Sequence, residues 1–323
     1  MAENIKPNPG ALENFREEFL AAWAQLPDKG LFFGLLAAWL ALFQFLGNST
    51  FGYVDTPSLL GWMLNAYNAP NSEDGHGNLI PFVVLGLCWW KRKELLAAPK
   101  QIWWPALGGV LAALALHVVG YTVQQPRLSV VALFAGLYGL TGLVWGRAWL
   151  KASFFPFVLL AFCIPVGSLG ESITFPLRMF ATNITTTVSN TLLGISVIQD
   201  GVRIFDPNGA YQYEVAAACS GIRSLISLTA LTTIYGFVTF KTPWKQCLFV
   251  VLAVPLAVAN NVARLSAVII AAEAFGQQAG MVVHEWFGFV SFAAALGVVL
   301  AVGHWLREEE PGATTPVLKA ESA

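Results

Sequence analysis

Three residues in the last third of the chain, Cys219, Arg264 and His284, have side chains suited to acyl transfer. A thiolate is a nucleophile, an imidazole takes a proton and returns it to a leaving amine, and a guanidinium holds a developing oxyanion. Ser220 and Gly221 follow the cysteine and open a long apolar run, which predicts a helix beginning there. Backbone N–H groups and the dipole at a helix start favour the thiolate.

Polar neighbours accompany each of these residues. Arg223 lies four positions after the cysteine, on the same helical face, within reach of the sulfur or of a bound substrate. Asn260 and Asn261 precede Arg264 in an otherwise apolar run, and ionisable residues at membrane depth are candidates for function. Glu285 follows the histidine, which it could orient unless it is simply solvated. These neighbours are predicted to bind substrate or to support the three residues.

Other candidates lie elsewhere in the chain. His76, between two glycines in EDGHGNLIP, is a second candidate base or a substrate contact. Arg178 and Arg203 could meet anionic lipid or substrate. The histidines are scattered without an acidic cluster, so neither a metal site nor a cofactor is expected. No basic block indicates nucleic acid.

Each candidate also has a structural interpretation that the sequence leaves open. Cys219 could be a small packing residue, as the other three cysteines are expected to be. Arg264 could pair with Glu273 or extend toward the membrane surface. His284 could be a polar anchor at the membrane interface, and His76 could mark a polar helix entry.

The composition indicates an integral membrane protein. Of 323 residues, 56% are hydrophobic and 11% are charged, against about 25% charged in soluble domains. A membrane helix needs about 20 apolar residues, and the continuous apolar runs favour helices over a barrel. We predict an all-α polytopic membrane protein with about eight spans, near residues 30–47, 77–91, 103–121, 127–146, 153–170, 219–240, 246–272 and 284–306.

Basic clusters predict the orientation. With eight spans, all four clusters fall on one side together with the N-terminal tail, so that side should be cytoplasmic and both termini should lie there. The predicted parts are a tail (1–29), a transmembrane catalytic domain (30–306) and a disordered tail (307–323). The clusters are Lys91, Arg92, Lys93 and Lys100; Arg147 and Lys151; Lys241 and Lys245; and Arg307.

The segment 171–218 should face outward and is the least membrane-like part of the core. Residues 172–194 mix apolar positions with Thr and Asn, which predicts an amphipathic helix at the interface; a ninth span is the alternative. Residues 197–216 have strand-like composition around the turn signal DPNG, which predicts a small extracytoplasmic β-hairpin leading to the cysteine.

These residues resemble the exosortase/archaeosortase family in several motifs in the same order, over about residues 30–306. The resemblance implies a fold and a set of roles: Cys219 as nucleophile, Arg264 as oxyanion stabiliser and His284 as base, with Asn261 and Arg264 in the Asn-x-x-Arg positions. The matching stretches are HGNLIP, LLGISVIQDG, DPNGAYQYEVAAACSGIRSL, NNVAR and HEWFG.

The resemblance also implies a membrane cysteine transpeptidase or protease of the inner membrane, with its site on the outer face. Its partners would be secreted proteins bearing a C-terminal sorting signal of the PEP-CTERM type, and membrane lipids. The acyl group would pass through a thioester to an unknown acceptor, whether lipid, glycan or water. A transporter, a lipid-modifying transferase using the Arg264 and Asn261 polar site, and a non-catalytic membrane subunit are the alternatives.

Overall fold

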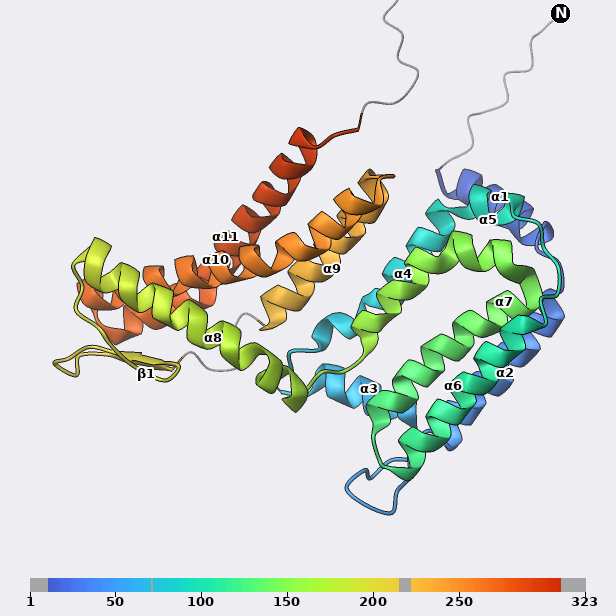
Figure 1. The fold of residues 1–323 in the computed structure, drawn as a ribbon, viewed down its shortest axis with the longest axis horizontal. Coiled ribbons are helices and arrows are strands. Elements are labelled where there is room, and N and C mark those ends of the chain that lie inside the picture. The colour runs from blue at the N-terminus through green and yellow to red at the C-terminus, as the bar shows by residue number, and fades with distance from the viewer. Residues whose placement is uncertain (1–10, 71, 215–221, 309–323) are drawn as a thin grey trace, which may run out of the picture. The chain divides into compact units, whose positions relative to one another are not determined.

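A computed structural model describes residues 11–70, 72–214 and 222–308, and the chain forms two compact units, Met1–Ser168 and Leu169–Ala323. Helices dominate, with one small sheet, so the prediction of an all-α polytopic protein is confirmed (Figure 1). The first unit contains α1 (Ala11–Ala24), α2 (Lys29–Phe45), α3 (Leu59–Asn68), η1 (Gly75–Asn78), α4 (Ile80–Trp90), α5 (Arg92–Ala97), α6 (Pro105–Thr122), α7 (Pro126–Val158) and η2 (Leu159–Cys163). The second contains α8 (Ser168–Val188), η3 (Ser189–Leu193), β1 (Ile198–Asp200), β2 (Arg203–Phe205), β3 (Gln212–Glu214), α9 (Ile222–Thr239), α10 (Pro243–Phe275) and α11 (Gln277–Trp305).

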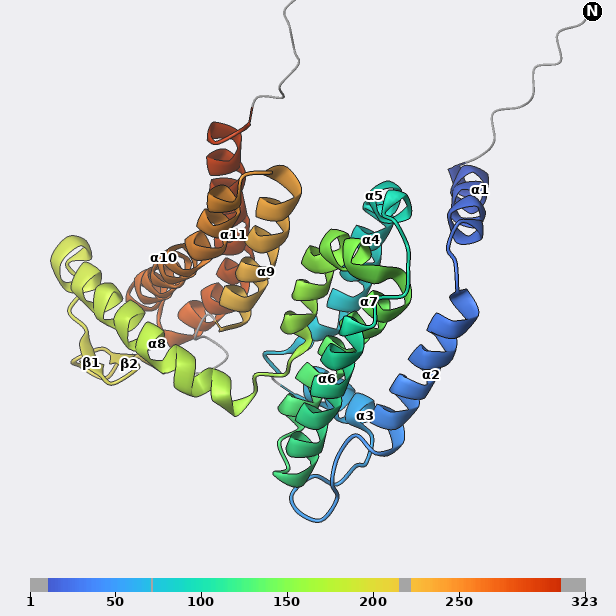
Figure 2. The ribbon, with the colours of Figure 1, turned by 45° about the vertical axis from the view of Figure 1, so that its right-hand side comes forward.

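Each predicted span has a helical counterpart, but the helices differ in length. By length and composition, four stretches of the described chain could cross a membrane: Pro105–Thr122, Pro126–Cys163, Pro243–Phe275 and Gln277–Trp305. A fifth is counted if α1 and α2, which meet at 94°, form one broken span (Figure 2). The apolar helix α4 and the Leu225–Thr239 part of α9 are shorter than the roughly 20 residues that a bilayer requires.

The predicted spans 127–146 and 153–170 correspond to the two arms of α7 and its extension η2. The backbone breaks at Gly146, whose φ of 90° and ψ of 177° are non-helical; this φ favours glycine. The hydroxyl of Tyr138 in the first arm donates to the carbonyl of Leu150 in the second at 2.6 Å. A Cβ on Gly142 would lie 2.4 Å from Leu150, so the two arms are in close contact just beside the break.

Basic residues of the first unit gather at one end of it. Arg92 forms an ion pair with Glu18 at 2.6 Å, and the ammonium of Lys91 donates to the carbonyl of Ala152 at 3.4 Å. Ala152 follows the α7 break by six residues, so the first two basic clusters meet there. A buried apolar cluster binds α2, α5 and α7 at the same end: Phe32, Leu95, Val144, Trp145, Trp149 and Ala152.

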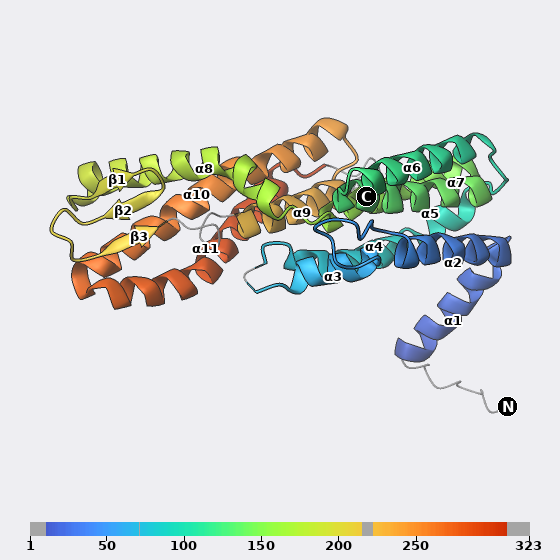
Figure 3. The same cartoon turned by 90° about the horizontal axis from the view of Figure 1, so that it is seen from below.

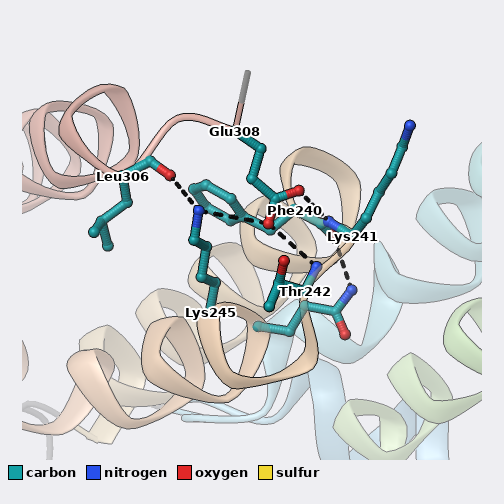
Figure 4. A network of polar contacts seen from close by, with 7 residues as sticks. Phe240, Lys241, Thr242, Lys245, Leu306 and Glu308 are labelled. Atoms are coloured by element: carbon teal, nitrogen blue, oxygen red, sulfur yellow. Dashed lines mark hydrogen bonds and ion pairs between the residues drawn. The ribbon is translucent and has the colours of Figure 1, made fainter. Parts of the chain in front are cut away.

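The second unit is built on α9, α10 and α11, whose shared core includes Leu228, Phe249, Ala253 and Val299. The end of α11 is fixed to the loop between α9 and α10 (Figure 4). Glu308 accepts hydrogen bonds from the backbone N–H groups of Lys241 at 3.0 Å and Thr242 at 3.2 Å.

The electrostatics of this junction favour an ionised carboxylate. A hydrogen bond from the Thr242 side chain, then the backbone N–H of Lys241, and also the nearby Lys245 ammonium lower the pKa of Glu308 to about 2. The Lys245 ammonium lies 3.5 Å from this carboxylate. The last two basic clusters therefore share one end of the second unit, which agrees with the prediction that they face one side.

The sheet is a three-stranded antiparallel meander in the order β1–β2–β3. The turn predicted at DPNG is confirmed: Asp206 accepts hydrogen bonds from the backbone N–H groups of Asn208 and Ala210 and joins β2 to β3. The single hairpin expected is an incomplete description. A second turn at Gly201 divides VIQDGVRIF into β1 and β2, and Asp-Gly is itself a hairpin-turn signal.

Two tyrosines attach the sheet to the turn between α10 and α11. The Tyr211 hydroxyl donates to the Glu273 carboxylate at 3.1 Å, and the Tyr213 hydroxyl donates to the Gln277 carbonyl at 2.9 Å. Burial, then the Glu273 carboxylate, raises the pKa of Tyr211. Glu273 is therefore a partner of the sheet, and no ion pair with Arg264 is needed to explain it. The sheet and the basic cluster lie at opposite ends of the α10–α11 hairpin.

The amphipathic helix predicted over 172–194 is present as α8 and η3. The π-turn of η3 fixes its end to the sheet, since the Asn190 side chain bonds to both backbone groups of Val197. Its most polar residue is buried, however: Arg178 and Thr182 are buried while Phe175 and Phe180 are exposed. A helix lying on a surface would show its polar side to water.

Candidate functional site

Arg264 and His284, which the sequence placed only at a similar depth, contact each other. The arginine lies in the second half of α10 and the histidine in the first half of α11, after the tight turn at Gly276. Nη2 of Arg264 is 3.0 Å from Nε2 of His284. Both residues are half-buried. The antiparallel hairpin thus brings together a permanent cation and an imidazole.

This contact fixes the tautomer of a neutral imidazole. A guanidinium has only donors, so Nε2 of His284 accepts the hydrogen bond and Nδ1 carries the proton. Nε2 can take a further proton only when Arg264 has moved away from it. In this arrangement the lone pair of Nε2 is therefore used to hold the arginine.

Gly288, one turn after His284, provides room for the guanidinium. A Cβ at this position would lie 3.8 Å from Cζ and from Nη1 of Arg264. The arginine side chain thus lies over a surface of α11 that has no side chain. Gly288 was missed as a site residue by the sequence argument, although its spacing of four from the histidine puts both on one helical face.

The two asparagines occupy different surroundings. Asn261 is buried on α10, one turn before Arg264. Asn260 lines a cavity of about 250 Å³ between α10 and α11, with Phe287 and Ser291 on the opposite wall. Its Oδ1 is buried and has no hydrogen-bond partner within the described residues. The polar character of this part of α10 therefore continues beyond the arginine.

The predicted nucleophile is outside the described residues. Cys219 and Ser220 belong to residues 215–221, and α9 begins at Ile222, directly after them. Arg223 is the second residue of α9, and its side chain is also outside what is described. The prediction that Cys219 lies at a helix start with Arg223 on its face stays a prediction.

His76 lies in the first unit, in η1, and is half-buried. The neighbouring Asp74 accepts hydrogen bonds from the backbone N–H groups of Val166 at 2.9 Å and Gly167 at 3.1 Å, which connects η1 to the chain after η2. Burial lowers the pKa of His76, with the Asp74 carboxylate acting in the opposite direction. A neutral imidazole suits either role that the sequence assigned to it.

The remaining predicted residues lie at the surface. Glu285 is exposed on α11. Arg203 is exposed on β2, where the register puts Asp200 on one side and Glu214 on the other; cross-strand pairs of opposite charge stabilise sheets. Arg203 is thus explained by the sheet itself. Within the described chain, no group of three or more His, Cys, Asp or Glu residues is arranged to hold a metal ion.

Comparison with protein families gives one match. The family described as transmembrane exosortase matches residues 62–301, which include both asparagines, Arg264 and His284 and extend across most of the chain. No curated protein and no solved structure matches.

Proposed function

Because the chain belongs to the transmembrane exosortase family, we propose that it is a membrane cysteine transpeptidase or protease that cleaves C-terminal sorting signals of exported proteins. The contact between Arg264 and His284 is the observation that carries the proposal. A half-buried cation beside an imidazole is what acyl transfer at a membrane needs, and a packing role would require neither residue. The reaction is proposed for the outer face of the cytoplasmic membrane, with both termini inside.

In the proposed reaction, the sulfur of Cys219 attacks the carbonyl carbon of the scissile peptide bond. The C–S bond forms, and the carbonyl oxygen becomes an oxyanion that Arg264 stabilises. His284 takes the thiol proton and gives it to the leaving amine as the C–N bond breaks. An acceptor amine, hydroxyl or water then attacks the thioester, and the thiol is restored.

The geometry adds an order to these steps. Since Nε2 of His284 accepts from Arg264, the arginine must leave the imidazole before Nε2 can take the proton. We place this exchange at substrate binding, when the carbonyl oxygen offers Arg264 a new acceptor. One movement then supplies both the oxyanion stabiliser and the base.

A reporter protein carrying a C-terminal sorting signal from the same genome tests the function. Expressed with the wild-type enzyme, the reporter should become smaller, and with Cys219→Ala it should keep its full length. Cys219→Ser should also lose activity, because a serine hydroxyl is a much weaker nucleophile at neutral pH. Equal reporter size with the wild type and Cys219→Ala would remove the proposal.

A further inference from the structure

Helix α8 has a buried polar face on which most of the polar groups have no hydrogen-bond partner within the described chain. Arg178, with 7% of its surface exposed, lies on the same face as Thr182, Thr185 and Ser189, each 0% exposed. Their spacings of three and four residues form a single line along the helix. The exposed side of α8 is mixed, with Phe180 beside Asn183 and Thr187. A buried polar line on a membrane protein normally marks a site or an internal hydrogen-bond network.

Within the described chain, a hydrogen bond accounts for one member of this line: the Thr185 hydroxyl donates to the Ala181 carbonyl at 2.8 Å. Nε and Nη2 of Arg178 are buried and have no hydrogen-bond partner among the described residues. The same holds for the hydroxyls of Thr182, Thr186 and Ser189. Elsewhere, described arginines that are partly buried have acceptors: Arg127 donates to a backbone carbonyl at 2.8 Å.

A buried guanidinium without an acceptor is unfavourable, because the charge has left water and gained nothing in return. Buried polar groups in native proteins are nearly all satisfied, so a set of four unsatisfied groups on one face indicates a missing ligand. The planar fork of arginine matches a carboxylate, which can accept two parallel hydrogen bonds. A hydroxyl one turn further along supplies a third donor to the same group.

An apolar groove also borders α8. Helix α8 crosses α10 at an angle (Figures 1 and 3), and residues of both helices line an apolar groove of about 630 Å³. Leu177 and Ala263 both line this groove. The arginine that follows each of them points about 100° further around its helix and lies on a neighbouring face. The groove is suited to an apolar chain, and Arg178 adds a positive charge on the helix that forms one wall.

We infer that Arg178, with the Thr182 hydroxyl, binds an acidic side chain of the substrate polypeptide. The inference rests on the proposed function for the identity of the ligand, and on the unsatisfied donors of α8 for its chemistry. The carboxylate would accept from Nε and Nη2 of Arg178 and from the Thr182 hydroxyl. The residue selects a substrate; it takes no part in the exchange of the acyl group.

Binding to the Cys219→Ala protein in detergent tests the inference without turnover. The probes are two synthetic peptides taken from a Glu-containing sorting signal of the same genome, one with that Glu and a twin with Gln in its place. A charge-assisted hydrogen-bond pair corresponds to about 10- to 100-fold in affinity. We expect Arg178→Ala to weaken the Glu peptide by this factor, and to leave the Gln twin nearly unchanged. Asn183→Ala, an exposed change on the same helix, is the matched control.

A stability measurement separates a binding role from a structural one. If Arg178 serves a ligand, Arg178→Met should unfold at an equal or higher temperature than the parent without peptide, because an unpaired buried charge is removed. A lower unfolding temperature, equal binding of the two peptides by the parent, or equal weakening of both by Arg178→Ala would overturn the inference. Glu selectivity that depends on Arg178, in a chain whose wild type does not cleave the reporter, would support the inference and refute the proposed function. Cleavage without Glu selectivity would do the reverse.

Discussion

Substitutions at Gly288 should test whether activity depends on the position of the Arg264 guanidinium and not only on the presence of this side chain. An alanine Cβ there would lie 3.8 Å from the guanidinium, an ordinary contact distance, so Gly288→Ala should keep most of the activity. Valine adds carbons about 1.5 Å beyond Cβ, which brings them inside the contact limit of about 3.5 Å. The guanidinium must then move off Nε2 of His284.

The expected size of the effect follows from the role assigned to Arg264. Loss of one oxyanion donor costs about 10²- to 10³-fold in kcat, or about 3–4 kcal/mol, and Gly288→Val should approach this loss. The assay is the initial rate of reporter cleavage at matched enzyme level, with the unfolding temperature measured in parallel. Gly297→Val is the control, because α11 has open space at that position. Wild-type rate for Gly288→Val, or an equal loss for Gly297→Val, would refute the reasoning.

Three further predictions concern neighbouring contacts. Glu308 has a folded-state pKa of about 2, below its ordinary 4.5. Its stabilising effect is therefore complete above about pH 4.5 and is lost as the pH falls toward 2. Glu308→Gln should flatten this part of a plot of unfolding temperature against pH, and an unchanged plot would contradict the prediction. Gly280→Ala would put a Cβ 2.0 Å from the Tyr213 hydroxyl, so it should lower the unfolding temperature. Tyr213→Phe in the same chain should recover part of that loss. An unchanged unfolding temperature for Gly280→Ala alone would contradict the packing of the sheet against α11. In the His284→Gln variant, the glutamine can still accept a hydrogen bond from Arg264 but cannot accept a proton. The residual cleavage rate of this variant should therefore rise with pH through about 8.5, the ordinary pKa of a thiol. A pH profile like that of the wild type would exclude His284 as the base.

The sequence was sufficient for the features that depend on local composition. The DPNG turn, the amphipathic stretch and the loops with basic residues all follow from the residues themselves. The grouping of basic residues at one end of each unit could also be predicted, because positive charges gather on one side of a membrane protein. The contacts of Glu308 with the loop before α10, and of Arg92 with Glu18, show this grouping in each unit. Which side of the membrane these ends face stays a prediction.

Features set by packing could not be predicted. An apolar run predicts a helix but not its first residue, and α4 begins only at Ile80, because GHGN forms a separate 3₁₀ turn beside Asp74. The burial of Arg178 depends on which side of α8 faces the rest of its unit. The turn at Gly201 was not predicted, because the Asp-Gly pair lies between strand-like residues that together resemble one strand.

The contact between Arg264 and His284 could not be predicted from their similar depth in the membrane alone. Spacing along two helices places both residues in the half of the α10–α11 hairpin near its turn, about 17 Å or less from it at 1.5 Å per residue. Contact also requires that both helices be rotated correctly about their axes, and this rotation is determined by packing along the hairpin. Once the side chains are in contact, the arginine N–H and an incoming proton compete for the lone pair on Nε2 of His284. An arginine that stabilises an oxyanion and a histidine that accepts a proton at Nε2 cannot both act while they bind each other. The roles assigned to them are therefore compatible only if substrate separates the pair, which makes the resting contact part of the reaction sequence.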